Sequence, residues 1–208
     1  MTYLFVDTNV LLHYRRLEEI DWLSLSKSKE VVIVLCPAVI RELDRLKVGH
    51  PQSKFRRRAQ EIIAILHSKH SGVDSELIRA SVRLEFLAED PSIDFSAHKL
   101  RLELDDDWLI ASILEWRRKR PGDEIRIVSA DLGVSIKAKA HGILALAPRE
   151  ADKLAEELDA DEKRLKKLQR RVGRNQEYAP RLEVMFPRWK RRIPSQSYFA
   201  DGPRHQPN

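Results

Sequence analysis

Four short runs of apolar, mostly β-branched residues alternate with longer segments whose apolar residues recur three and four positions apart. The short runs lie at residues 3–6, 31–35, 125–128 and 143–146, and the last of them is the weakest. The helical patterns lie at residues 37–47, 54–69, 107–120 and 131–140. Strands that alternate with helices in this way form a parallel sheet covered by helices. The sequence therefore predicts an α/β fold with a central parallel sheet.

Two other parts of the chain follow this alternation less clearly or not at all. Residues 71–104 are expected to form either a helix with a long connection or an insertion over one edge of the sheet. Residues 148–172 run from acidic to basic and carry a narrow leucine stripe, which predicts a long C-terminal helix that docks on the domain. Residues 173–208 form a basic tail with prolines and aromatic residues, and residues 1–147 form the main domain.

The size and composition of the chain favour one domain with a modest appendage. Its 208 residues are 42% hydrophobic, which is enough for one substantial core. Cys36 is the only cysteine, so no intramolecular disulfide can form, and a reducing, cytoplasmic location is expected. The N-terminal segment reaches the acidic Asp7 before a signal-peptide core develops, and no apolar run approaches the roughly 20 residues that span a bilayer. Neither secretion nor a membrane partner is expected.

Acidic residues stand where the predicted strands give way to loops or helices. In a parallel sheet, ligands gather beyond the carboxyl ends of the strands. Asp7 ends the first predicted strand, and Asp131 follows the strand at residues 125–128. Glu42 lies about one turn into the helix after the second strand, and Asp107 opens another helix. These acids are therefore expected to converge on one rim of the sheet.

A cluster of carboxylates is stable only with a cation, because unpaired carboxylates a few ångströms apart repel one another and take up protons. Oxygen ligands of this kind select Mg²⁺ or Mn²⁺. One or two such ions polarise a phosphate oxygen, orient a water for in-line attack and neutralise the leaving oxyanion. The pattern therefore indicates hydrolysis of phosphodiesters without a protein nucleophile.

The segments that contain these acids resemble the motifs of the PIN-domain nucleases and occur in that family's order. They read VDTNVLL at 6–12, RELDRLK at 41–47, DWLIASIL at 107–114 and VSADLGVSIKA at 128–138. The resemblance covers about residues 2–147, and it implies a Rossmann-like, three-layer α/β/α sandwich with Mg²⁺- or Mn²⁺-dependent endoribonuclease activity. It implies these catalytic metal ligands: Asp7, Glu42, Asp107 and Asp131. Asn9 and Ser129 match polar positions that support the first and fourth acids.

The third motif departs from the family pattern. Asp107 has the usual spacing to Ile110 and Ala111, but Asp105 and Asp106 stand beside it and are further candidate ligands. The chain is also longer than the small toxin-type members, and its second motif looks closer to that of longer relatives in RNA processing. The sequence leaves open whether the protein is a toxin, with an inhibitor (antitoxin) protein as its partner, or an RNA-processing enzyme. It also leaves open whether the protein forms a homo-oligomer.

Each acid also has a simpler structural interpretation. Asp7 and Asp131 are good helix caps, and the acids at residues 105–107 suit a helix N-terminus. Glu42 has the spacing of a surface ion pair with Arg45. Each interpretation is reasonable for one residue, but four acids in family order favour a site.

Two basic segments are candidate RNA-binding surfaces. The first contains Lys54, Arg56, Arg57 and Arg58 around Phe55, and its alternative is a solvated helix face. The second, in the tail, interleaves aromatic and cationic side chains as proteins that bind single strands do, and its alternative is an arm that packs on a partner subunit. The tail residues in question are Trp189, Lys190, Arg191 and Arg192.

The sequence thus favours a metal-dependent endoribonuclease that cuts RNA. One rival is a catalytically silent module that binds RNA or acts as a scaffold, although the presence of all four acids argues against it. The other is a nuclease of DNA or flap structures, because no feature of the sequence identifies a reader of the RNA 2′-hydroxyl.

Overall fold

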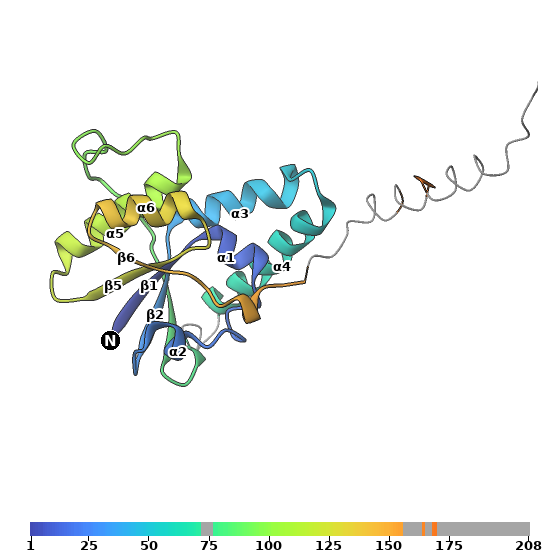
Figure 1. The fold of residues 1–208 in the computed structure, drawn as a ribbon, viewed down its shortest axis with the longest axis horizontal. Coiled ribbons are helices and arrows are strands. Elements are labelled where there is room, and N and C mark those ends of the chain that lie inside the picture. Colours follow the sequence, from blue (N-terminus) through green and yellow to red (C-terminus); the bar gives the residue numbers. More distant parts are fainter. Residues whose placement is uncertain (72–76, 156–163, 165–167, 170–208) are drawn as a thin grey trace, which may run out of the picture. The chain divides into compact units, whose positions relative to one another are not determined.

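A six-stranded sheet forms the middle of the protein, with the strands in the order β3-β4-β2-β1-β5-β6 (Figure 1). The computed structural model describes residues 1–71 and 77–155, together with residues 164, 168 and 169. The strands are β1 (Thr2–Val6), β2 (Val31–Leu35), β3 (Leu77–Arg79), β4 (Val82–Phe86), β5 (Glu124–Val128) and β6 (Leu144–Leu146). Neighbouring strands are parallel except β3, which runs antiparallel to β4. The α/β fold with a central parallel sheet is therefore confirmed.

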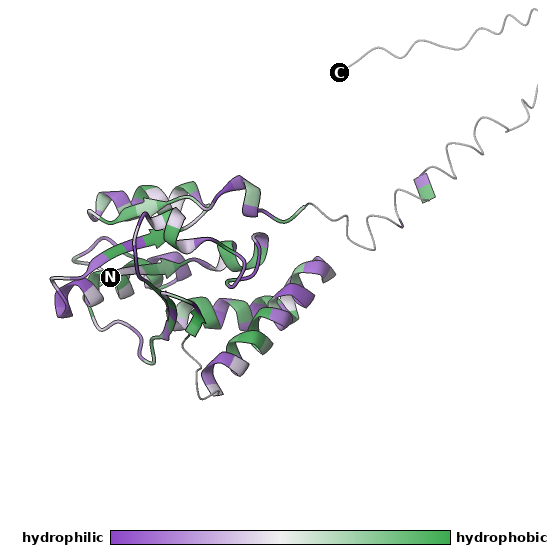
Figure 2. Cartoon of the chain, turned by 90° about the horizontal axis from the view of Figure 1, so that it is seen from below, coloured by the Kyte–Doolittle hydropathy of each residue, from purple (hydrophilic) through white to green (hydrophobic). Residues whose placement is uncertain are grey.

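The central strands β1 and β2 are buried along their whole length. Figures 1 and 2 show helices on both sides of the sheet, so both faces of these strands are covered. Burial on both faces explains why the two strands are continuous apolar runs rather than alternating ones. Leu4 of β1 pairs with Ile33 on one side and with Arg126 on the other. The core is therefore organised around β1.

Four of the described helices lie close to their predicted positions, and two short helices near the N-terminus were not predicted. They are α1 (Thr8–His13), α2 (Trp22–Ser26), α3 (Pro37–Gly49), α4 (Ser53–Ser71), α5 (Asp105–Lys119) and α6 (Leu132–Ala140), followed by the 3₁₀ helix η1 (Glu150–Asp152). Pro37 starts α3, where its missing N–H leaves no hydrogen bond unmade. In Figure 2 the helical ribbons change between purple and green along their length, as helices with one buried and one exposed face do. The four predicted helices are confirmed.

The segment at residues 71–104 adds β3 and β4 to one edge of the sheet. In β4, the buried Val82 and Leu84 alternate with the more exposed Arg83 and Glu85, which is the period of a strand. The expectation of a helix in this segment was wrong, and the alternative of an insertion at the sheet edge is nearer to the structure. The insertion extends the sheet by hydrogen bonding instead of lying over it.

The beginning of the predicted C-terminal helix is not α-helical. Residues 148–155 contain only the short η1 and an extended piece in which Lys153 forms a β-bridge with Tyr14. The Leu154 N–H donates to the His13 carbonyl oxygen at 2.9 Å, so this piece pairs with the chain after α1. Acidic residues favour a helix N-terminus, but here backbone pairing takes precedence. Of the later part, Arg164, Leu168 and Gln169 are helical, and the rest of the predicted helix and the tail lie outside the described residues.

Within the part of the chain that the structure describes, no helix has both the length and the apolar character needed to cross a membrane.

Candidate active site

The site forms where the direction of strand addition reverses. From β1 the chain proceeds to β2 on one side, whereas β5 pairs with the other side of β1 and leads on to β6. Val6 and Val128 are paired, so the ends of β1 and β5 lie side by side. Ligands of open α/β sheets bind at such a switch point. Asp7 and Ser129 are the next residues of the two strands.

Asp7 is held by a small polar network. Asp7 is only 5% exposed. Its Oδ2 atom accepts hydrogen bonds from Asn9 Nδ2 and Ser129 Oγ, both at 2.6 Å. Asn9 Nδ2 also donates to Ser129 Oγ at 3.2 Å. The Asp7 side chain makes no capping hydrogen bond to α1, although Asp7 is the N-cap residue. The hydrogen-bond geometry therefore does not support the capping interpretation, although the Asn9 backbone N–H lowers the pKa of Asp7, and the side chains of Asn9 and Ser129 orient its carboxylate.

The pKa of Asp7 is raised to about 6, mainly by burial and then by the charges of Asp106 and Glu42, against the lowering effect of the Ser129 hydrogen bond. The protein thus holds a carboxylate in a place that disfavours its negative charge. A cation bound nearby would reverse this effect, because an opposite charge favours the ionised form.

Glu42 lies on α3, facing the same region. Burial raises its pKa, as do the charges of Asp105 and Asp106, while the nearby Thr8 hydroxyl and Arg45 lower it. Arg45 forms its ion pair with Asp105 rather than with Glu42. The surface-pair interpretation of Glu42 is therefore not supported.

Thr8 brings a buried hydroxyl to this region. Its Oγ1 has no partner in hydrogen-bonding geometry among the residues that the structure describes, although it is near enough to Glu42 to lower the pKa of that carboxyl. A buried hydroxyl without a partner is costly unless water or a ligand satisfies it. A hydroxyl near Glu42, on the residue that follows Asp7, fits a bound, hydrated ion.

Asp131 has two features of interest. Its Oδ1 accepts from the backbone N–H groups of Gly133 at 2.6 Å and Val134 at 3.2 Å, so it caps α6. A Cβ on Gly133 would lie 3.0 Å from this oxygen, which explains the glycine. The charge of Asp131 also raises the pKa of Asp106. The capping interpretation is confirmed, and the same residue lies beside the other acids.

The three consecutive acids of α5 have different surroundings. Asp107 is 2% exposed, and each of its oxygens has a donor: Lys137 Nζ lies 2.5 Å from Oδ1, and the Arg101 N–H lies 2.8 Å from Oδ2. Asp105 pairs with Arg45. Asp106 is the member of the three whose charge raises the pKa of Asp7. The charge of Asp106 therefore acts on Asp7, whereas Asp107 is held in an ion pair with Lys137.

The pKa of Asp106 is itself raised, mainly by burial and then by the charges of the neighbouring acids, against the lowering effect of Lys137. Asp7, Glu42 and Asp106 thus share a raised pKa and act on one another through their charges. Lys137 and Arg101 were not selected from the sequence, because Lys137 is a basic residue within the fourth acidic motif and Arg101 lies outside all four motifs.

The donor set fits a hard divalent cation. In the described ranges, no three His, Cys, Asp or Glu side chains already stand in the arrangement of a metal site. The carboxylates nonetheless gather at one rim, their pKa values are raised by burial first and then by one another's charges, and Thr8 adds a buried hydroxyl near Glu42. Carboxylate and hydroxyl oxygens are the ligands that Mg²⁺ and Mn²⁺ accept.

Comparison with known families identifies the domain. The sequence model of the PIN domain matches residues 4–149, a span that includes every acid described above. The chain belongs to the PIN-domain family. Members of this family are generally nucleases, so this PIN domain has a nuclease fold.

Other comparisons add little to this assignment. A solved structure described as a domain of a functionally unknown protein from Methanocaldococcus jannaschii is 18% identical, with a TM-score of 0.41. The similarity covers 76% of this chain and 99% of that one. No curated protein sequence matches this PIN domain.

Two of the basic residues of α4 make hydrogen bonds to the backbone of neighbouring segments. Arg58 donates to the carbonyl oxygens of Leu11 and Tyr14 at the end of α1, and Arg56 donates to those of His50 and Pro51. Arg57 lies 3.9 Å from Glu61 in an exposed pair, and Lys54 lies over the Phe55 ring. RNA binding by these residues stays a prediction, and the tail residues Trp189, Lys190, Arg191 and Arg192 lie outside the described region.

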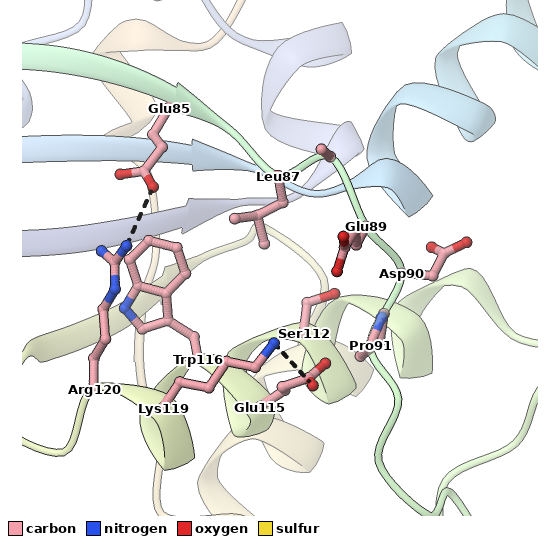
Figure 3. Close-up of a pocket in the computed structure, with 11 residues that line it drawn as sticks. Glu85, Leu87, Glu89, Asp90, Pro91, Ser112, Glu115, Trp116, Lys119 and Arg120 are labelled. Carbon is pink, nitrogen blue, oxygen red and sulfur yellow. Dashed lines mark ion pairs between the residues drawn. The ribbon is translucent and has the colours of Figure 1, made fainter.

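A cavity of about 270 Å³ opens between the loop after β4 and α5 (Figure 3). Charged groups line it, but they pair with one another: Lys119 with Glu115 at 3.1 Å and Arg120 with Glu85 at 3.9 Å. Arg120 also stacks on Trp116, with 4.0 Å to the ring centroid. None of the acids around Asp7 lines this cavity, so it does not compete with them as the active site.

The raised pKa of Asp7 makes apoprotein stability depend on pH. Its folded pKa of about 6 exceeds the ordinary value of 3.8, so the folded state binds the proton more tightly and stability falls as pH rises from about 4 to 6. We expect Asp7→Asn to be more stable than the wild type above pH 6, by on the order of 1–3 kcal/mol. Urea unfolding in EDTA at pH 5 and pH 7.5 measures this.

The difference in unfolding free energy between the wild type and Asp7→Asn isolates the contribution of Asp7. Other carboxyls, such as Glu115, whose pKa is lowered, make stability rise with pH, but they do so equally in both proteins. The exposed Asp44, paired with Lys47 on α3, offers a matched control in Asp44→Asn. A large loss of stability in Asp7→Asn at pH 7.5 would contradict the account of Asp7.

Proposed function

We propose that this PIN domain is a Mg²⁺- or Mn²⁺-dependent endoribonuclease that hydrolyses RNA phosphodiester bonds at the acidic cluster around Asp7. The observation that carries the proposal is the buried Asp7 carboxylate, oriented by Asn9 and Ser129 at the sheet's switch point and facing Glu42 and Asp106. A protein does not collect a buried carboxylate and two half-buried ones at an open sheet end for stability, because each raises the cost of ionising the others.

The residues that would hold the cation are Asp7, Glu42, Asp106 and Asp131. The chemistry that Mg²⁺ or Mn²⁺ supplies at such a site is polarisation of the phosphate and activation of a water. Asn9 and Ser129 fix the direction of the Asp7 carboxylate, since both donate to Oδ2. The Thr8 hydroxyl is placed to hydrogen-bond a water or a phosphate oxygen.

Asp107 is proposed as a positioning residue instead of a ligand. The motif spacing favours it, but Lys137 and the Arg101 backbone already occupy its two oxygens. This pairing ties the start of α5 to α6 and so fixes the direction of Asp106 relative to Asp131.

RNA is proposed as the substrate, with an inhibitor protein or a second copy of the chain as further partners. Both a toxin role and an RNA-processing role are compatible with the cluster. The single cysteine, Cys36, is fully buried and reduced, which suits the proposed cytoplasmic location.

The test is cleavage of matched RNA and DNA oligonucleotides of one sequence, each labelled at either end, with Mn²⁺, Mg²⁺ or EDTA. We expect internal cuts in the RNA with either metal and none in EDTA. Preferential cutting of the DNA would favour the rival nuclease, and binding of RNA without any cutting would favour the silent module. Asp44→Asn, outside the cluster, serves as the matched control and should cut like the wild type.

A further inference from the structure

One aromatic ring stands outside the core, between two imidazole rings. Phe55 is half-buried but does not belong to the hydrophobic core or to the apolar side chains packed on it. Its ring centroid lies 4.9 Å from that of His13 and 4.7 Å from that of His50, with interplanar angles of 64° and 65°. Lys54 Nζ lies 5.1 Å from the same centroid. We call Phe55, His13 and His50 the ring cluster.

The backbone holds the ring cluster firmly in place. His13 is the last residue of α1, His50 caps the end of α3, and Phe55 lies in the first turn of α4. The Gln52 N–H donates to His50 Nδ1 at 3.1 Å, and Arg56 donates to the His50 carbonyl oxygen at 2.5 Å. The turn between α3 and α4 is thus tied to His50, so the rings are preorganised.

Two helices lead from the acidic cluster to the ring cluster. α1 begins beside Asp7 and ends at His13, six residues on, which at 1.5 Å per residue is about 9 Å. α3 carries Glu42 and ends next to His50, about 12 Å away along its axis by the same measure. At about 3.4 Å per nucleotide of a stacked strand, this distance corresponds to roughly three nucleotides.

The charges around the rings are mostly positive. Burial lowers the pKa of His13, and the charges of His50, Lys153 and Lys54 lower it further. Glu150 pairs with Lys153 nearby at 3.2 Å. Aromatic rings amid ammonium groups are the composition that stacks on bases while attracting the phosphate backbone.

We propose that the ring cluster is a stacking site for a base of the single-stranded RNA, about three nucleotides from the bond that is cut. This inference rests on the proposed nuclease function and names how the same site grips its substrate. The proposed site differs from a purely cationic RNA-binding surface on α4, because its affinity for RNA comes from the Phe55 ring as well as from charge.

The test is binding of a fluorescent 12-nucleotide RNA in EDTA, followed by anisotropy. Phe55→Leu keeps an apolar side chain but removes the aromatic face, and we expect it to weaken binding by about tenfold. Phe55→Trp should bind at least as tightly as the wild type. Phe86→Leu is the matched control, since its ring also contacts a histidine, His70, with 5.5 Å between centroids, but does not belong to the ring cluster, and it should bind normally.

Cleavage assays separate this inference from the proposed function. With the 12-mer, Phe55→Leu should raise KM and keep kcat, whereas cutting of a dinucleotide, which is too short to reach the rings, should be unchanged. If Phe55→Leu folds and binds the 12-mer like the wild type, the ring cluster serves something else, such as a protein partner, and the inference is wrong. If the wild type never cuts RNA with metal but Phe55→Leu still binds it weakly, the nuclease proposal fails and the stacking site stands.

Discussion

Asp7→Asn is expected to lower metal-dependent RNA cleavage by at least about a hundredfold while leaving the fold intact. Loss of a metal-supporting residue costs roughly ten- to a hundredfold, and a direct ligand should cost at least as much. Asparagine keeps the shape, and its carbonyl oxygen can still accept the hydrogen bonds that Asn9 and Ser129 now donate to Oδ2. Single-turnover cleavage at matched Mn²⁺ measures the effect.

The pattern of results distinguishes a lost ligand from a damaged fold. Asp7→Asn should melt no lower than the wild type in EDTA, because it removes a buried charge. Asp44→Asn, on the exposed side of α3, should cleave normally. Cleavage by Asp7→Asn at the wild-type rate would show that Asp7 is not part of the active site.

Asp106→Asn and Asp107→Asn are expected to fail in different ways. Asp106→Asn should lose cleavage as severely as Asp7→Asn, without loss of apoprotein stability, because its carboxylate faces the cluster and has a raised pKa. Asp107→Asn should lower the free energy of unfolding by about 1–3 kcal/mol, because it leaves the Lys137 ammonium unpaired beside a buried side chain. The partial exposure of Lys137 keeps this cost below that of a fully buried pair.

Cleavage rate and urea unfolding, measured on the same preparations, test this pair of variants. Asp105→Asn is the control, since it loses a partly exposed pair with Arg45 and should change both quantities least. An Asp107→Asn protein that is fully stable but inactive, beside an active Asp106→Asn, would make Asp107 the ligand, as the motif spacing alone suggests.

Much of the fold could be predicted because the central elements carry strong local patterns. β1 and β2 are covered on both faces, so they appear as uninterrupted apolar runs, and α3 has a proline at its first position. β3 was missed because it is a three-residue edge strand, and β4 was missed because the alternation of Val82 and Leu84 with charged residues is weak over five residues. The extended piece near Leu154 depends on backbone pairing with the chain after α1, which no local pattern reveals.

The location of the site could be predicted more fully than the roles within it. Acids at the carboxyl ends of parallel strands come together regardless of the residues around them, because the sheet topology places those strand ends at the same edge. Asp106 and Asp107 could not be separated, since α5 is buried on nearly all sides from Asp107 to Trp116 and its sequence shows no polar face. What separates them is Lys137, thirty residues away in sequence.

The most direct test of the central claim is Mn²⁺ binding, measured by calorimetry at pH 6 and pH 8 in buffers of different ionisation enthalpy. The wild type should bind Mn²⁺ and release about half a proton more at pH 6 than at pH 8, because the pKa of Asp7 is about 6 in the apoprotein. Asp7→Asn and Asp106→Asn should bind at least about tenfold more weakly. The assignment of these acids as the metal site would be contradicted if a protein with both Asp7→Asn and Asp106→Asn bound Mn²⁺ with wild-type affinity. It would also be contradicted if the wild type did not bind Mn²⁺.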